Sequence, residues 1–278
     1  MSDMTKLSTY VFPAGGLRCY YFTANPIHAI DIIRNKHLFA SLPSNVNDPN
    51  DLKLEVKGQL NRSYLEDALV RNSFTPEGLR FLQPQGIISG LERSLGQKTL
   101  MDRVYRFVCF AKADCVDADK RSAFRFWQKY AKSFGGVRFE FLIDKSFTTA
   151  PAPHEVLCDE IKYGARSAIL DLSTLNSAAD IVESLNEPGF MDGFAYTKSQ
   201  KWSCEYELRI GTTVRRLNAI GNGQFVNFDG SRMIGISIGE RVNRSAMHEL
   251  LRMSKLQGLC TTIAKGNRRD KQISYTVM

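Results

Sequence analysis

The chain has 278 residues, of which 43% are apolar and 24% charged, a composition that excludes a largely disordered protein. No stretch approaches the roughly 20 apolar residues of a membrane span, and the first residues lack a signal-peptide pattern, so we expect a cytoplasmic protein. The net charge of +8 favours anionic partners, and six dispersed cysteines without metal-ligand spacing argue against a zinc site.

The first part of the chain predicts a strand, a helix and a second strand. Residues 18–23 form the first strand, and Asn25 and Pro26 then supply an N-cap and a first helical residue. A short apolar run at 38–42 predicts the second strand. The Asn- and Asp-rich segment 45–51 is a loop by composition, and it either forms turns with its own side chains or holds a ligand.

The middle of the chain predicts a helical insertion at about 60–100, a buried strand at 104–111, and then a helix. One face of that helix carries four apolar residues at spacings of three, four and three: Phe124, Trp127, Ala131 and Phe134. Gly135 and Gly136 are expected to end it. Alternating apolar residues from 137 to 143 predict the next strand.

The remaining segments mix strands and helices without regular alternation. Strands are predicted at 156–163, 225–228, 233–238, 259–264 and 272–277, and helices at 178–187 and after a cap at Ser245. This order fits an α+β fold with a curved, mainly antiparallel sheet and flanking helices, and not a doubly wound sheet. We expect one catalytic-type domain over residues 1–278.

The most informative stretch runs from Trp202 to Ile210 and is predicted to be a strand. Side chains alternate along a strand, so Glu205, Glu207 and Arg209 would share one face. Neighbouring carboxylates raise each other's pKa values and a nearby Arg lowers them, which is how an acid–base or electrostatic site is built. The simpler interpretation is a solvent-facing strand with a cross-strand ion pair.

Five short motifs follow one another along nearly the whole chain. They are Tyr20-Tyr21, Asn47-Asp48-Pro49, Cys109-Phe110, Trp127 with Tyr130-Ala131 and Gly136-Val137, and Trp202 with Glu205, Glu207 and Arg209. In this order they resemble a bacterial family of unknown function that is often encountered near phage-resistance genes. The resemblance covers about residues 20–240, and by itself it implies no reaction.

A more distant likeness is to the ADP-ribosyltransferase superfamily, and it is carried by the early strand, helix and strand and by the late Glu-x-Glu strand. The resemblance implies that Glu207 holds the nicotinamide-ribose hydroxyl of NAD and stabilises the oxocarbenium ion. It implies that Glu205 helps to activate the acceptor and that residues 191–201 form the substrate-recognition loop. The chain departs from the superfamily in lacking a clean aromatic-Ser-Thr triplet.

The resemblance and the residue types together nominate a set of NAD-binding residues. Arg18, Tyr20 and Tyr21 compete for the first-strand position, and Ser41 matches the hydroxyl-bearing strand. The complete set is Arg18, Tyr20, Tyr21, Ser41, Asn47, Asp48, Trp127, Tyr130, Trp202 and Arg209. Trp127 and Tyr130 are aromatic residues on an apolar helix, for which core packing is the commoner role.

Three classes of function follow. The first is an NAD-dependent ADP-ribosyltransferase or NAD glycohydrolase, acting as a toxin or phage-defence effector with nucleic acid as its acceptor. The second is a basic nucleic-acid-binding module or a nuclease in which Asp48, Asp51, Glu205 and Glu207 surround a divalent cation. The third is a sensor or scaffold without enzymatic activity.

Overall fold

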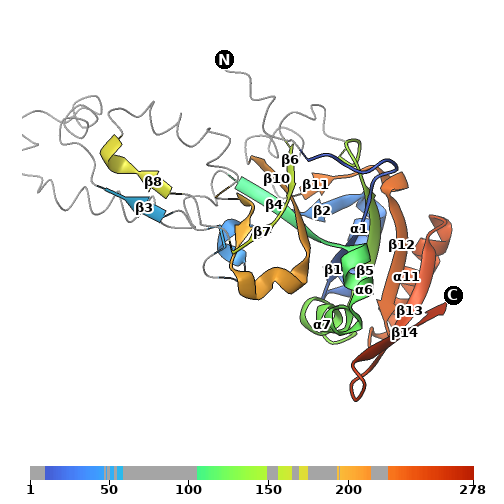
Figure 1. The fold of residues 1–278 in the computed structure, drawn as a ribbon. Coiled ribbons are helices and arrows are strands. Elements are labelled where there is room, and N and C mark those ends of the chain that lie inside the picture. Colours follow the sequence, from blue (N-terminus) through green and yellow to red (C-terminus); the bar gives the residue numbers. More distant parts are fainter. Residues whose placement is uncertain are drawn as a thin grey trace, which may run out of the picture. The chain divides into compact units, whose positions relative to one another are not determined.

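The computed structural model describes residues 10–46, 48, 51–52, 55–58, 105–148, 156–164, 169–174, 193, 195–213 and 225–278 (Figure 1). Contacts divide the chain into two compact units. The larger unit contains residues 1–41, 106–161 and 201–278, and the smaller unit contains residues 42–105 and 162–200. The single domain stays a prediction. The predicted insertion at 60–100 and the predicted helix at 178–187 lie outside the described residues.

An eight-stranded sheet forms the framework of the larger unit, in the order β14-β13-β12-β5-β1-β4-β10-β6. Its strands are β1 (Leu17–Thr23), β4 (Tyr105–Lys112), β5 (Val137–Ile143), β6 (Val156–Glu160), β10 (Glu207–Thr213), β12 (Met233–Gly239), β13 (Cys260–Asn267) and β14 (Gln272–Val277). Strand β1 pairs antiparallel with β4 and β5, as do β5 with β12, β6 with β10 and β13 with β14, whereas β12 and β13 are parallel. The prediction of an α+β fold with a mainly antiparallel sheet is confirmed.

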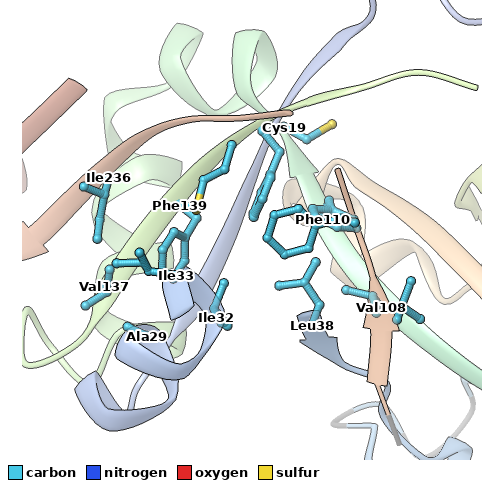
Figure 2. Packing of buried hydrophobic residues seen from close by; sticks show 14 of the residues in the cluster. Cys19, Ala29, Ile32, Ile33, Leu38, Val108, Phe110, Val137, Phe139 and Ile236 are labelled. Carbon is cyan, nitrogen blue, oxygen red and sulfur yellow. The ribbon is translucent and has the colours of Figure 1, made fainter. Parts of the chain in front are cut away.

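Helices cover both faces of this sheet, because the side chains of each strand alternate between two apolar layers. On one face, Cys19 of β1 and Phe139 of β5 pack with α1 (Pro26–Asn35) in the main core (Figure 2). Helix α11 (Arg244–Leu256) contributes to the same core. On the other face, Tyr20 packs with α6 (Ala113–Ala118) and α7 (Lys120–Tyr130). The predicted alternation from 137 to 143 is confirmed as β5.

Shorter elements complete the described structure. In the larger unit, β2 (His37–Phe39) pairs with β11 (Phe225–Asn227), and η6 (Gly230–Arg232) is a 3-10 turn. In the smaller unit, β3 (Glu55–Lys57) pairs with β8 (Ile169–Asp171), and β7 (Lys162–Tyr163) pairs with β9 (Thr197–Lys198). Three further 3-10 turns are η2 (Pro43–Asn45), η4 (Leu172–Thr174) and η5 (Gln200–Glu205). Because β9 and the start of η5 fall within residues 191–201, that segment is not wholly a loop as predicted.

Two helix caps can be compared with the sequence prediction. The side chain of Asn25 accepts a hydrogen bond from the Ile27 amide at 2.9 Å, and Pro26 is the first residue of α1, so this prediction is confirmed. The predicted cap at Ser245 is wrong, because Asn243 caps α11 by accepting a hydrogen bond from the Ala246 amide at 2.9 Å. Both residue types cap helices well, and the choice depends on where the extended backbone ends.

Helix α7 ends at Tyr130, before the predicted stop at Gly135 and Gly136. Lys132, Ser133 and Phe134 all have positive φ, so the backbone turns sharply and returns the Phe134 ring to the core. That ring stacks on Trp127 with the centroids 5.2 Å apart. A Cβ on Gly239 would lie 2.1 Å from the Phe134 carbonyl oxygen, so only glycine fits against this turn.

Asp119 caps the N-terminus of α7. Its carboxylate accepts hydrogen bonds from the Ser122 hydroxyl at 2.6 Å and from the Arg121 amide at 2.9 Å. The Ser122 bond, followed by the backbone bonds, lowers the pKa of Asp119 below its usual value. A carboxyl group with a lowered pKa stabilises the fold above its unfolded pKa of about 4, and this contribution is lost as the pH falls.

We expect Asp119→Ala to lower the free energy of unfolding by about 1 kcal/mol at neutral pH, because α7 loses its capping acceptor. Asp119→Asn is the matched control, since asparagine keeps a capping oxygen. Urea denaturation at pH 7 and at pH 3 measures both variants. Equal stability of wild type and Asp119→Ala at pH 7 would show that the cap contributes nothing.

Candidate functional site

Glu205 and Glu207 lie on different elements. Glu205 is the last residue of η5 and Glu207 is the first residue of β10, and Tyr206 between them has a left-handed backbone with φ of 47°. The prediction that Glu205, Glu207 and Arg209 share one strand face is therefore wrong for Glu205, because a left-handed residue breaks the alternation of an extended strand. Glu207 and Arg209 do share a face.

A pocket of about 390 Å³ lies between α7 and η5, within the larger unit. The residues of chemical interest that line it are Arg125, Lys129, Tyr130, Lys201, Trp202 and Glu205. Glu205 is the one carboxylate among the described residues that line this pocket. This volume is within the range of small-molecule sites, so the pocket is the candidate functional site.

Glu205 is held by two neighbours from the end of α7. The Lys129 ammonium lies 2.7 Å from Glu205 Oε1, and the Tyr130 hydroxyl donates a short hydrogen bond to the same oxygen. Burial, followed by the charge of Glu205, raises the pKa of Tyr130. Tyr130 therefore stays protonated at neutral pH and acts as a hydrogen-bond donor beside a carboxylate that is only 7% exposed.

Cations and an indole ring are among the other groups that line the pocket. The Lys129 ammonium lies 3.8 Å from the centroid of the Trp202 ring, and the Lys201 ammonium lies 5.6 Å from it. With Arg125, the pocket has three cationic side chains against the single carboxylate of Glu205. This charge balance and the indole ring suit an anionic ligand that contains a planar ring.

Glu207 and Arg209 form a buried ion pair on β10. The Arg209 guanidinium donates to Glu207 Oε1 through Nε at 2.9 Å and through a terminal nitrogen at 2.7 Å, and it lies 4.7 Å from the centroid of the Phe107 ring. Glu207 is 5% exposed and Arg209 is 0% exposed. The interpretation as a solvent-facing strand with a cross-strand ion pair is therefore wrong, since the pair is buried and lies within one strand.

The residues predicted to fill the NAD-binding position on the first strand lie away from the pocket lining. Arg18 pairs with Glu140 at 2.8 Å on β5, and the Tyr20 hydroxyl donates to Asp117 at 2.7 Å. Tyr21 packs in the main core on the opposite face of the sheet, where burial raises its pKa to about 12. None of these three residues lines the described pocket. Ser41 forms a β-bridge with Phe107, the residue whose ring contacts Arg209.

The two aromatic candidates of α7 have different roles. Trp127 is fully buried and donates a hydrogen bond from its indole nitrogen to the Tyr275 hydroxyl at 3.2 Å, so it belongs to the core. Tyr130 contacts Glu205 in the pocket. Sequence reasoning missed Lys129 as a site residue, although it lies between Trp127 and Tyr130 in the motif and four residues after Arg125.

The candidates from the Asn-Asp-Pro loop belong to the smaller unit. Asn47 lies outside the described residues, whereas Asp48 is buried and accepts a hydrogen bond from the Ser199 hydroxyl at 2.6 Å. Asp51 is also buried, with the Lys198 ammonium 3.5 Å away. Among the described residues, no three His, Cys, Asp or Glu side chains gather as a metal site. No helix within the described ranges is long and apolar enough to cross a membrane.

Comparison with known proteins gives no match for this chain among family models, curated proteins or solved structures. The function is therefore inferred from the chemistry of the pocket.

Proposed function

We propose that the pocket binds NAD and that the protein is an ADP-ribosyltransferase or an NAD glycohydrolase with an ADP-ribosyltransferase-like fold. The observation that carries this proposal is the position of Glu205, a carboxylate in a pocket that is also lined by three cationic side chains and by the indole ring of Trp202. An anion is what a reaction through a cationic sugar needs, and cations with a ring suit a dinucleotide.

The reaction breaks the bond between C1′ of the ribose and the nicotinamide nitrogen. The bonding electrons leave with nicotinamide, which becomes neutral, and the ribose becomes an oxocarbenium cation. Water or a nucleophilic acceptor then forms a new bond to C1′ and loses a proton. A fixed carboxylate near C1′ stabilises the cation, and the loss of one such electrostatic group typically costs about 10² to 10³ in rate.

Glu205 is the residue to which we assign this stabilising role, because it lines the pocket. The superfamily resemblance assigns the role to Glu207, but the carboxylate of Glu207 is buried against Arg209. We assign Glu207 and Arg209 a positioning role, in which their ion pair fixes the start of β10 directly after η5. Tyr130 and Lys129 orient the Glu205 carboxylate.

The other lining groups fit the remaining parts of NAD. Arg125 and Lys201 are suited to the pyrophosphate, and Trp202 is suited to one of the two planar rings. We further propose a cytoplasmic toxin or phage-defence effector, with nucleic acid as the acceptor when the reaction is a transfer. The basic charge of the chain supports an anionic acceptor.

We expect NAD to raise the melting temperature of the protein without any metal ion. A ligand at about 100 times its dissociation constant stabilises the folded state by about 2.7 kcal/mol, which corresponds to several degrees in a chain of this size. Melting curves recorded in chelator with increasing NAD measure the shift. Arg125→Met should reduce it, and Arg244→Met on α11 is the matched control. A melting temperature that is unchanged by millimolar NAD would contradict binding.

A further inference from the structure

A basic stripe runs along the solvent-facing side of α7. Arg121, Arg125 and Lys129 follow one another at intervals of four residues, so they lie in a row on one side of the helix. Arg121 and Arg125 are exposed, and neither forms an ion pair with any acidic residue that the structure describes. Arg125 and Lys129 also line the pocket, so the basic stripe leads directly into the candidate site.

A second basic segment lies on the other flank of α7. The β13–β14 hairpin carries the exposed residues Lys265, Arg268, Arg269 and Lys271 around its turn. Strand β14 packs against α7 (Figure 1). Tyr275 of β14 accepts the hydrogen bond from Trp127. Helix α7 therefore has the basic hairpin on one flank and, through Lys129 and Tyr130, η5 on the other.

We propose that this surface binds single-stranded nucleic acid and that the strand is the acceptor of the reaction. The phosphates contact the hairpin and then the start of the basic stripe at Arg121, and one base reaches the mouth of the pocket, next to the NAD that the pocket is proposed to hold. Lys and Arg residues in a row neutralise successive phosphates. The binding of nucleic acid is inferred from the positions of the charged residues alone. The role of the bound strand as acceptor rests on the proposed function.

The pocket favours a single strand over other anionic partners. A base reaches the mouth of this pocket at little cost only when it is unpaired, since a duplex must first lose its pairing and stacking there. An acidic peptide would match the cations but would bring no base to the mouth of the pocket. A membrane surface would meet the cations without using a pocket of about 390 Å³.

The test measures the binding of a fluorescently labelled single-stranded oligonucleotide of about 12 nucleotides in the absence of NAD. Fluorescence anisotropy is the readout. We expect affinity to fall as salt rises, with a logarithmic slope of about 0.7 for each phosphate contacted. The double variant Arg268→Glu, Arg269→Glu should bind about tenfold or more weakly and show a smaller salt slope. The double variant Arg244→Glu, Lys255→Glu makes the same change of charge on α11, across the sheet, and should bind as the wild type does.

Several results would overturn the proposal. They are no binding by the wild type at low salt, equal or tighter binding of the same sequence as a duplex, equal binding of polyglutamate, and equal losses in the hairpin variant and in the α11 double variant. Circular dichroism of each variant separates these results from unfolding. Nicotinamide release, measured separately, distinguishes failure of the binding surface from failure of the NAD proposal.

Discussion

Glu207→Gln is expected to lower the free energy of unfolding by about 3 to 5 kcal/mol. The substitution removes a charge that pairs with the Arg209 guanidinium at 2.7 Å, and Arg209 is 0% exposed. Removing one partner of a buried ion pair takes away part of the compensation of the charge that remains, and the cost is typically of this size. Urea denaturation followed by circular dichroism measures the loss.

The double variant Glu207→Gln, Arg209→Met tests whether the loss of stability comes from the buried charge that remains on Arg209. Methionine removes the buried charge and keeps much of the apolar contact with Phe107, so the double variant should be more stable than Glu207→Gln alone. Glu249→Gln on the exposed side of α11 is the matched control and should change stability little. A Glu207→Gln variant as stable as the wild type would contradict the role given to the pair.

Glu205→Gln is expected to reduce nicotinamide release from NAD by about 10² to 10³ while the protein stays folded. Glutamine keeps the size of the side chain and an oxygen that accepts from Tyr130, but it removes the charge that stabilises the ribose cation. The rate is measured by chromatography of nicotinamide under saturating NAD. Glu249→Gln again provides the control.

Comparison of the two glutamates assigns their roles. Glu207 has a positioning role if the activity of Glu207→Gln falls in proportion to its stability. Full activity in Glu205→Gln together with inactivity in a folded Glu207→Gln would instead favour the assignment implied by the superfamily resemblance. Tyr130→Phe should have a smaller effect than Glu205→Gln, because it removes a hydrogen bond and no charge.

The strands of the large sheet could be predicted because their side chains alternate. Val137, Phe139 and Phe141 face the main core, and Arg138 faces α7, as a period of two requires. The start of β10 could not be predicted in the same way. The left-handed backbone of Tyr206 has no sequence signal, since the residue is neither glycine nor asparagine.

The pocket was only partly predictable for a related reason. Glu205, Tyr130 and Trp202 were candidates from their motifs, but Lys129 and Arg125 join them only because α7 packs against η5. A contact between residues about 75 positions apart is set by tertiary packing and leaves no local pattern in the sequence. The end of α7 was missed because three successive left-handed residues replace the expected glycine stop.

The most direct test of the account is nicotinamide release from NAD by the wild-type protein in the presence of chelator, with and without a single-stranded oligonucleotide. The account predicts that nicotinamide is released without metal, and that ADP-ribose appears either free or attached to the oligonucleotide. Intact NAD under both conditions would contradict it. Cleavage of the oligonucleotide that requires a divalent cation, with NAD left intact, would favour the nuclease instead.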